Sequence, residues 1–260
     1  MHGTVSLTDL RRQATVLGGG FHGDVFLWQD RVYKVYKSAG VRHLESGNMR
    51  FVGLQDWVLG SFETEGREVL MMKPFPGKPV SAQSLLGVSA AIGSWLDILH
   101  AAREGAPEVS TERVREKLSQ FSELRHAETE FLFSEVEEAL ASGCLEVLAS
   151  FCHLDLWSDN ILVSESGEVL VVDWVRAQWD DPMRDIALLK TGTLDLLPEP
   201  DSLLALSSYV KSASDRLRLR AYLALTYLHD LVWLGKNQPE TMSWNYPFKI
   251  SRARGALGYL

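Results

Sequence analysis

Two carboxylates and one amide follow one another at short spacing in the middle of the sequence. Asp155 is followed five positions later by Asn160, and Asp173 comes after an apolar segment, a turn at residues 164–167 and a second apolar segment. The two apolar segments are typical of the strands of a short hairpin. A hairpin of this length would fold Asp173 back beside Asn160, so the sequence predicts that three oxygen-bearing side chains converge.

Side chains of these types suit phosphoryl transfer. Mg²⁺ prefers oxygen ligands and usually takes only one or two of them from the protein. Asn160 and Asp173 would supply those ligands and leave room for phosphate oxygens. Asp155 would accept the proton of an attacking hydroxyl and aim that hydroxyl at the phosphorus. Taken alone, Asp155 is more simply an ordinary loop carboxylate, so the prediction depends on the ordered spacing of the whole set.

The arrangement resembles the catalytic loop of kinases, in which an Asp and an Asn five residues later are followed by a metal-binding Asp. His153 comes two positions before Asp155, and Asp173 is followed by Trp174 instead of Phe-Gly. In both respects the segment is similar to the aminoglycoside phosphotransferase and choline kinase family. The resemblance implies that His153 is a hydrogen-bonded structural residue and not a general base.

Two neighbouring segments extend the resemblance. The Leu-Trp-Ser sequence at 156–158 is similar to fructosamine kinases, and residues 181–187 resemble the Asp-Pro-x-x-Asp-Leu-Ala element of the family. The resemblance implies that Asp185 holds the backbone of the catalytic loop by hydrogen bonds. One position departs from the family pattern. The family usually has Gly after the His, whereas this chain has Leu154, whose side chain must be packed.

The resemblance covers nearly the whole chain and implies an α+β, bilobal, protein-kinase-like fold. A small lobe with an antiparallel β-sheet, which binds the nucleotide, is expected over residues 1–75. A larger and mostly helical lobe over residues 76–260 would carry the catalytic loop and the acceptor site. The specific motifs lie mainly between Cys152 and Ala187.

A glycine-rich segment lies in the expected sheet lobe, between two segments with the pattern of strands. It contains Gly18, Gly19, Gly20 and Gly23. Glycine lets the backbone approach a phosphate and offers N–H groups as donors. On its own, such a segment is more often a plain hairpin turn. The resemblance implies that Gly19, Gly20 and Gly23 cover the nucleotide.

The next expected strand, residues 31–37, carries two lysines. Because side chains alternate along a strand, Lys34 and Lys37 point to opposite faces. The resemblance implies that Lys34 contacts the α- and β-phosphates, and Lys37 is the competitor for this role. A helix expected over residues 42–51 supplies Glu45 as the candidate partner of Lys34. A plain surface position is the alternative for Glu45.

A hairpin that turns at residues 65–66 is expected to end at Met72, and a proline-rich stretch follows it. Prolines prevent the strand from continuing and stiffen an extended path. The resemblance implies that this stretch is the hinge between the lobes. Met72, Lys73 and Phe75 would then meet the adenine edge of the nucleotide. An ordinary proline-rich connection is the alternative.

The rest of the chain is expected to be mostly helical. Apolar residues recur at helical spacing from Leu85 to Leu99, and His100 closes that helix as a packed structural residue. A capping box is expected at Ser134. The other expected helices are two between residues 110 and 150, one over 203–210, one over 217–234 that stops at Gly235, and a short one in the C-terminal tail.

Composition restricts the partners of the 260-residue chain. The formal charge of −8 makes nucleic acid an unfavourable partner and favours a cationic ligand. Cys144 and Cys152 form neither a metal pattern nor a disulfide framework, as expected of reduced thiols in a cytoplasmic protein. We expect no signal peptide, no apolar run that spans a bilayer, no membrane partner, and a monomer or a weak dimer.

The predicted reaction transfers the γ-phosphoryl group of ATP or GTP to a hydroxyl of a small molecule, with Mg²⁺ as the cofactor. The alternatives are a protein kinase and a non-catalytic nucleotide-binding module. The absence of an Ala-Pro-Glu segment and of a long activation loop disfavours the protein kinase. Leu154 and the uncertain pairing of Glu45 leave the non-catalytic module open.

The acceptor is predicted to bear amines and many hydroxyls, as an aminoglycoside does. The negative charge favours this choice, and a choline-, sugar- or fructosamine-type acceptor is the alternative. Carboxylates would bind a polycation, whereas an aromatic cage would bind a quaternary ammonium. The candidate acceptor contacts are Trp157, Trp174, Asp180, Asp181 and Trp233.

Overall fold

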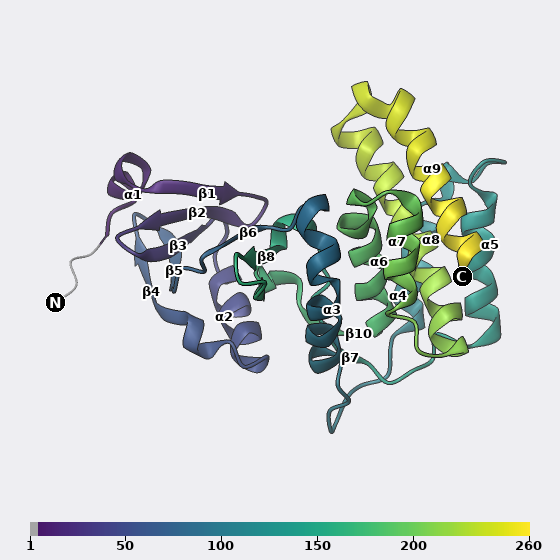
Figure 1. Ribbon diagram of the computed structural model, residues 1–260, viewed down its shortest axis with the longest axis horizontal. Helices are drawn as coiled ribbons and strands as arrows, with labels where there is room; N and C mark the ends of the chain where they lie inside the picture. The colour runs from purple at the N-terminus through teal and green to yellow at the C-terminus, as the bar shows by residue number, and fades with distance from the viewer. Residues whose placement is uncertain (1–4) are drawn as a thin grey trace. The chain divides into compact units, whose positions relative to one another are not determined.

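The computed structural model describes residues 5–260, which form two compact units (Figure 1). The first unit extends to Gly77 and also contains Val172–Ala177. The second unit consists of Lys78–Val171 and Gln178–Leu260. The architecture is the expected α+β fold, in which one unit is built on an antiparallel sheet and the other is mostly helical. The predicted division at residue 75 did not assign the segment Val172–Ala177 to the first unit.

A five-stranded antiparallel sheet forms the body of the first unit, with the strand order β1-β2-β3-β5-β4. Its strands are β1 (Thr15–Gly19), β2 (Gly23–Trp28), β3 (Arg31–Tyr36), β4 (Val58–Thr64) and β5 (Arg67–Met72), and its helices are α1 (Leu7–Gln13) and α2 (Val41–Phe51). The hairpin β4–β5 turns at Glu65 and Gly66, as predicted, with φ values of 49° and 72°. Both residues at the tip are left-handed, as a type I′ hairpin turn requires.

Helix α1 has no counterpart among the predicted elements. The side chain of Ser6 caps it by accepting a hydrogen bond from the main-chain N–H of Asp9 at 3.0 Å. Leu7 and Leu10 bury themselves in the core of the first unit, beside Phe26 and Val69. A cap residue followed by two apolar residues three positions apart was therefore the signal for this helix.

The second unit contains seven helices and five short strands, and the first of these strands leads into the unit. The helices are α3 (Ala82–Leu99), α4 (Thr111–Ser119), α5 (Glu130–Ser142), α6 (Pro182–Gly192), α7 (Glu199–Ser207), α8 (Ala213–Asn237) and α9 (Met242–Tyr259). The strands are β6 (Gly77–Pro79), β7 (Ser150–Cys152), β8 (Ile161–Ser164), β9 (Val169–Val171) and β10 (Gln178–Asp180). They form a β6-β8-β9 sheet and a β10-β7 pair. Helix α8 is buried along most of its length and packs against α5, α6 and α9 (Figure 1).

Three details of the predicted helices were wrong. Gly235 lies inside α8, which continues to Asn237. Ser134 lies within α5 and donates to the carbonyl of Glu130 at 3.1 Å, so it caps nothing. Helix α9 has 18 residues, whereas only a short helix was predicted, and it tolerates Pro247 in its interior.

Helix α3 tests the expectation that no apolar run is long enough to span a bilayer. Among the described residues it is the one helix long and apolar enough to cross a bilayer by length and composition alone, with a mean hydropathy of 1.3. The expectation that no such run exists was therefore wrong. Core helices meet the same criterion, and Leu85, Ile92 and Leu96 of α3 are buried.

Candidate active site

Lys34 is the centre of a buried ionic cluster in the first unit. Its Nζ atom lies 2.8 Å from Oε2 of Glu45 and 2.9 Å from Oδ1 of Asp173. Lys34 is 4% exposed and Glu45 is 1% exposed. The carboxylate of Glu45 also accepts hydrogen bonds from the hydroxyl of Tyr36 at 2.7 Å and from the main-chain N–H of Trp174 at 3.3 Å. The candidate pairing of Lys34 with Glu45 is therefore formed.

Strand register explains why Lys34 and not Lys37 occupies this cluster. Lys34 and Tyr36 share one face of β3, and both reach Glu45 on α2. Lys37 is about half exposed and donates to the carbonyl of Gly20 at 2.6 Å. The predicted difference in orientation between the two lysines is confirmed.

The cluster favours the charged form of Lys34. Burial alone would lower the pKa of Lys34, but attraction by Glu45 and Asp173 and the hydrogen bonds they accept raise this pKa above the ordinary value. Burial and the charge of Glu45 likewise raise the pKa of the Tyr36 hydroxyl far above its ordinary value. At neutral pH the site therefore presents a fixed ammonium and a neutral phenol.

The glycine-rich segment forms the turn between β1 and β2. Gly20 donates its N–H to the carbonyl of Gly23 at 2.9 Å, and Phe21 at the tip is 91% exposed. A Cβ atom on Gly23 would lie 2.5 Å from the carbonyl oxygen of Val35, so only glycine fits there. A Cβ atom on Gly19 would lie 2.9 Å from Oδ1 of Asp24. The glycines thus allow a close backbone approach, and their contact with phosphate stays a prediction.

The predicted hinge residues follow directly on the sheet of the first unit. Met72 is the last residue of β5, and the N–H of Lys73 donates to the carbonyl of Trp57 at 2.9 Å. The ring of Phe75 meets that of Trp57 edge-on, with a centroid distance of 5.9 Å. These contacts anchor the segment, and its role at the adenine edge stays a prediction.

Asp155 and Asn160 are joined within one loop of the second unit. The Nδ2 atom of Asn160 donates to the main-chain oxygen of Asp155 at 2.8 Å and to its carboxylate at 3.1 Å. The hairpin after this loop is the predicted one, with Ile161 opposite Val171. The loop therefore presents a carboxylate and an amide in a fixed relation.

A single buried carboxylate holds the start of this loop. Oδ2 of Asp185 accepts the N–H of His153 at 2.8 Å, and Oδ1 accepts the N–H of Leu154 at 2.7 Å. His100, at the end of α3, lies 2.9 Å from Oδ2 of Asp185 through its Nε2 atom. The predicted role of Asp185 in holding the loop backbone is confirmed.

Charge stabilises this arrangement. Burial would raise the pKa of Asp185, but the hydrogen bond and charge of His100 and the hydrogen bond from His153 lower this pKa below its ordinary value. Asp185 is therefore an anion that accepts hydrogen bonds from the loop.

Leu154 departs from the family pattern and adopts a left-handed backbone, with a φ of 59°. A side chain is unfavourable in this conformation, which glycine adopts freely. The Leu154 side chain is buried, as its apolar character requires. The loop thus keeps a glycine-like backbone and compensates the strain by burial and by the bond to Asp185.

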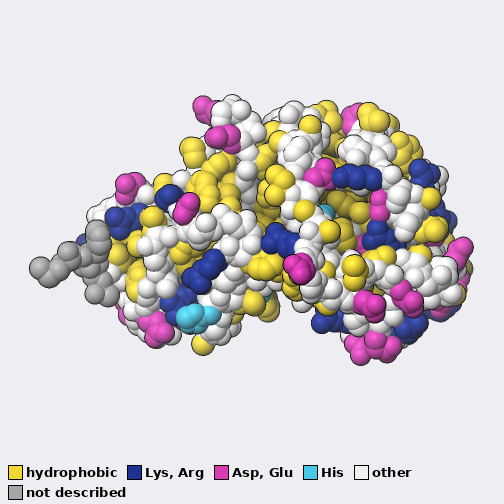
Figure 2. Space-filling view, turned by 90° about the horizontal axis from the view of Figure 1, so that it is seen from below, with side chains coloured by type: hydrophobic (Ala, Val, Ile, Leu, Met, Phe, Trp, Pro, Cys, Tyr) yellow, Lys and Arg dark blue, Asp and Glu magenta, His cyan; other side chains and the backbone are white. Residues whose placement is uncertain are grey.

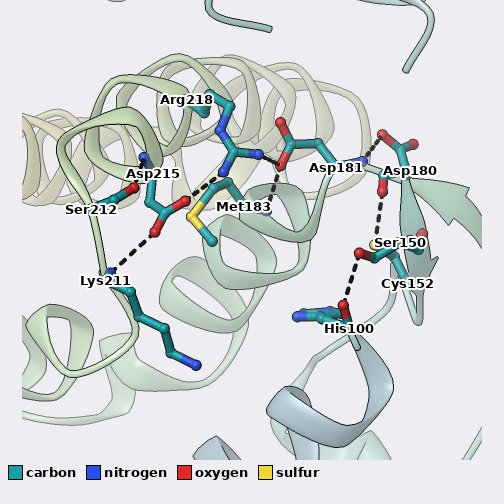
Figure 3. Close-up of polar contacts among 10 residues, drawn as sticks. All are labelled: His100, Ser150, Cys152, Asp180, Asp181, Met183, Lys211, Ser212, Asp215 and Arg218. Atoms are coloured by element: carbon teal, nitrogen blue, oxygen red, sulfur yellow. Dashed lines mark hydrogen bonds and ion pairs between the residues drawn. The ribbon is translucent and has the colours of Figure 1, made fainter. Parts of the chain in front are cut away.

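Three of the predicted acceptor contacts are wrong. Asp181 is fully buried, and its Oδ1 accepts from the N–H of Met183 at 2.9 Å and from Arg218 at 2.5 Å (Figure 3). Asp180 is buried and pairs with Arg184 at 2.5 Å. Trp174 is 1% exposed, so its ring offers no face to a ligand.

The other two predicted contacts are open to solvent. Trp157 is 41% exposed and Trp233 is 46% exposed. Gly192 packs under Trp157, since a Cβ atom there would lie 3.0 Å from the indole. Neither Gly192 nor Arg218 was singled out from the sequence, because Trp157 and Asp181, which they contact, lie more than thirty positions away.

Two groups of residues carry atoms of the kinds that bind metal ions. The nitrogen of the Asn160 amide faces Asp155, which leaves its oxygen for a cation, and Asp173 is partly exposed beside Lys34. Both offer the oxygen atoms that Mg²⁺ prefers. Asn160 belongs to the second unit and Asp173 to the first, and their convergence stays a prediction.

His100, Cys152 and Asp185 form a second group whose ligand atoms lie within 4.8 Å of one another. Burial and the nearby charges of Asp185, Asp180 and Asp181 raise the pKa of the Cys152 thiol well above its ordinary value. The oxygens of Asp185 are occupied by loop N–H groups. This chemistry disfavours a metal, because a thiol must lose its proton to bind one.

Comparison with known proteins places these features in a family. A sequence model of the phosphotransferase enzyme family (APH) matches residues 56–222. No curated protein sequence matches the chain.

Several solved structures share the fold. A choline/ethanolamine kinase family protein from Mesorhizobium loti is 17% identical, and the match covers 94% of this chain and 85% of that one with a TM-score of 0.64. Choline kinase LicA from Streptococcus pneumoniae is 18% identical, with coverage of 95% and 92% and a TM-score of 0.62. Aminoglycoside phosphotransferase APH(4)-Ia, solved as a thermostable mutant with AMP-PNP and hygromycin B, is 15% identical, with coverage of 95% and 94% and a TM-score of 0.69.

The matched region includes the catalytic loop, Asp173 and the segment that holds Asp185. It spans well over half of the 260 residues. The chain therefore belongs to the phosphotransferase enzyme family.

Proposed function

We propose that the protein is a Mg²⁺-dependent kinase that transfers the γ-phosphoryl group of ATP or GTP to a hydroxyl of a small molecule. The observation that supports this most is the complete set of polar residues that such a reaction needs. Lys34 is buried with Glu45 and Asp173, and Asp155 is joined to Asn160 in a loop that Asp185 holds.

Each residue has a proposed part in the reaction. Lys34 and the glycine-rich turn bind the phosphates, and Asn160 and Asp173 each supply an oxygen to Mg²⁺. When bound there, Mg²⁺ would supply positive charge to the phosphates. Asp155 orients the acceptor hydroxyl and accepts its proton. Positioning and charge neutralisation account for most of the catalysis, because phosphoryl transfer needs little covalent help from the protein.

Nucleotide as the co-substrate has support from structures of the same fold. LicA has been solved in complex with AMP, and APH(4)-Ia with AMP-PNP and with ADP. We place the reaction in the cytoplasm because nucleotide is available there. Both cysteines of the chain are free, which agrees with this location.

We propose an amine-bearing, hydroxyl-rich acceptor of the aminoglycoside kind. The formal charge of −8 supports a cationic ligand. Figure 2 shows that acidic side chains on the face drawn there are interspersed with Lys and Arg. That face therefore carries charges of both signs. The acidic groups that bind the acceptor have to lie close to the acceptor site itself.

A choline-like alcohol is the second candidate, favoured by one observation. Asp180 and Asp181 are occupied by arginines, whereas Trp157 and Trp233 expose their indoles. Aromatic faces bind a quaternary ammonium through cation–π contacts, which contribute about 0.5–2 kcal/mol each. Such an acceptor needs fewer free carboxylates than a polycation does.

A phosphotransfer assay with ATP and Mg²⁺ tests both the reaction and the acceptor. The acceptor panel comprises hygromycin B, spectinomycin, choline, a fructosamine and neutral sugars, and Asp155→Asn is the matched control. We expect phosphorylated product from an amine-bearing acceptor and a KM that rises with salt, since exposed charges are screened over about 10 Å at 0.1 M.

Two results would contradict the proposal in different ways. Turnover on neutral sugars alone, or a KM independent of salt, would contradict the cationic acceptor and leave the kinase reaction standing. Nucleotide binding without Mg²⁺-dependent turnover on any acceptor of the panel would favour a non-catalytic nucleotide-binding protein.

A further inference from the structure

A cavity of about 370 Å³ lies within the second unit. One side of α3, the first turn of α6, residues 208–211 and the start of α8 form its walls. None of Lys34, Asp155, Asn160 and Asp173 lines it. Its size is within the range of small-molecule sites, about 300–1,000 Å³.

One wall of this cavity is apolar. Leu96, Pro182, Met183 and Ile186 line it, together with Ala90. Gly93 and Tyr209 also line the cavity and lie close together, since a Cβ atom on Gly93 would lie 3.3 Å from the ring of Tyr209. The wall can receive an aliphatic side chain.

The rim carries an ion pair that can open. The side chains of Asp97 and Lys211 pair with each other while they remain 60% and 63% exposed. An exposed pair of this kind contributes little to stability, so its separation costs little. A ligand with a single charge would leave one partner of the opened pair without a counter-ion. A zwitterion satisfies both, because its ammonium replaces Lys211 at Asp97 and its carboxylate replaces Asp97 at Lys211.

Arg218 also lines the cavity. Its guanidinium lies between Asp181 and Asp215, at 2.5 Å from each (Figure 3). Arg218 is 9% exposed, and its Nε atom has no hydrogen-bond partner among the described residues. The Nε atom is closed off from solvent, so Arg218 forms part of the cavity wall, and its two aspartate partners fix its position.

We propose that this cavity binds an apolar α-amino acid. The ammonium and carboxylate lie at Asp97 and Lys211, and the aliphatic side chain lies on the Met183 wall. His100 lines the same cavity and bonds to Asp185, so the ligand lies next to the pair that holds the catalytic loop. The proposal does not depend on the identity of the acceptor or on turnover.

Isothermal titration calorimetry of the full chain, without nucleotide or Mg²⁺, tests the site. The probe is L-leucine, and N-acetyl-L-leucine and L-leucinamide each lack one of its charges. We expect saturable binding of L-leucine, at least about tenfold weaker binding of both analogues, and an unfolding temperature that rises with L-leucine concentration.

Three variants locate the binding. Asp97→Asn and Lys211→Met should each weaken binding of L-leucine by about tenfold or more. Gly93→Leu should abolish it by filling the cavity, and circular dichroism checks that this variant folds. Lys236→Met, at an exposed position outside the cavity, is the matched control and should bind L-leucine like the unchanged protein.

The proposal fails if L-leucine gives no saturable heat at tens of millimolar. Equal binding of L-leucine and L-leucinamide would overturn it as well, because the carboxylate would then have no partner. Undiminished binding in folded Gly93→Leu protein would show that L-leucine binds elsewhere, which also overturns it.

Discussion

The main-chain N–H of Leu154 donates a 2.7 Å hydrogen bond to Oδ1 of Asp185 while Leu154 itself has a φ of 59°. A left-handed leucine costs about 1–2 kcal/mol relative to the ordinary helical conformation. It persists only where the surroundings fix it, and a buried anion that binds two successive N–H groups does so. The backbone conformation of the residues just before Asp155 therefore depends on one carboxylate, which helix α6 supplies.

Replacing Asp185 with Asn should destabilise the protein by about 2–3 kcal/mol. The amide keeps one acceptor oxygen, but its NH₂ group faces a main-chain N–H, which is then buried without a partner. Chemical denaturation measures the change in the free energy of unfolding. Asp30→Asn, at an exposed position that tolerates a left-handed Asn, is the matched control and should change this free energy by less than about 0.5 kcal/mol.

The same variant should change the response to acid. The pKa of Asp185 is lowered on folding, so its contribution to stability is present above the ordinary pKa of 3.8 and is lost as the pH falls through the lowered value. The unfolding free energy of the Asn variant should therefore depend less steeply on pH below about 4. A slope equal to that of the unchanged protein would show that Asp185 is not a stabilising anion.

Asp155→Asn should leave folding and nucleotide binding intact and reduce kcat by roughly 10²-fold or more, which is the usual effect of losing acid–base help. Asn160 can still donate to the main-chain oxygen of residue 155, so the loop should keep its shape. Near-normal kcat in this variant would rule out Asp155 as the base.

Asp173→Ala should remove productive Mg²⁺–nucleotide binding, because the neutral Asn160 supplies no charge to the ion. Activity titrated against Mg²⁺ concentration measures this effect. Asp159→Ala, which removes an exposed carboxylate of the catalytic loop, is the control for general effects of charge. An unchanged Mg²⁺ requirement would mean that Asp173 is not a ligand.

Lys34→Met should impair nucleotide use strongly, and Lys37→Met only mildly. The first substitution removes the cation between Glu45 and Asp173, whereas the second loses only contacts at the exposed edge. Because Glu45 is buried, Lys34→Met should also cost roughly 3 kcal/mol of stability, so nucleotide affinity is measured on protein shown to be folded. The reverse ranking of the two variants would contradict the assignment of Lys34.

Local patterns predicted the parts of the site that one strand or one loop creates. Alternation along β3 separates Lys34 from Lys37, and the spacing of two apolar segments gives the hairpin after Asn160. The resemblance to kinases supplied the role of Asp185, which no local pattern contains. Such predictions succeed because the chain itself fixes the relation between neighbouring residues.

Long-range partners could not be predicted in this way. Asp181 was a candidate acceptor contact, but it is the N-cap residue of α6, and Arg218, 37 positions later, binds its carboxylate. Helix α9 contains Pro247, which alone would indicate a break, yet α9 packs against α8 and continues. In each case a tertiary contact outweighs the local preference, and a single sequence does not show which residues meet.

The six residues Val172–Ala177 return to the first unit after almost a hundred residues of the second. A fragment that stops at Gly77 would therefore lack Asp173, and the amide of Asn48 would lose both of its acceptors, the carbonyls of Trp174 and Ala177. The sheet unit expressed by itself should be incompletely folded, because Lys34 would lose Asp173 and Glu45 would lose the main-chain N–H of Trp174. The sheet unit of this protein is thus not a separable module, and during synthesis it can be completed only after the ribosome has passed residue 177.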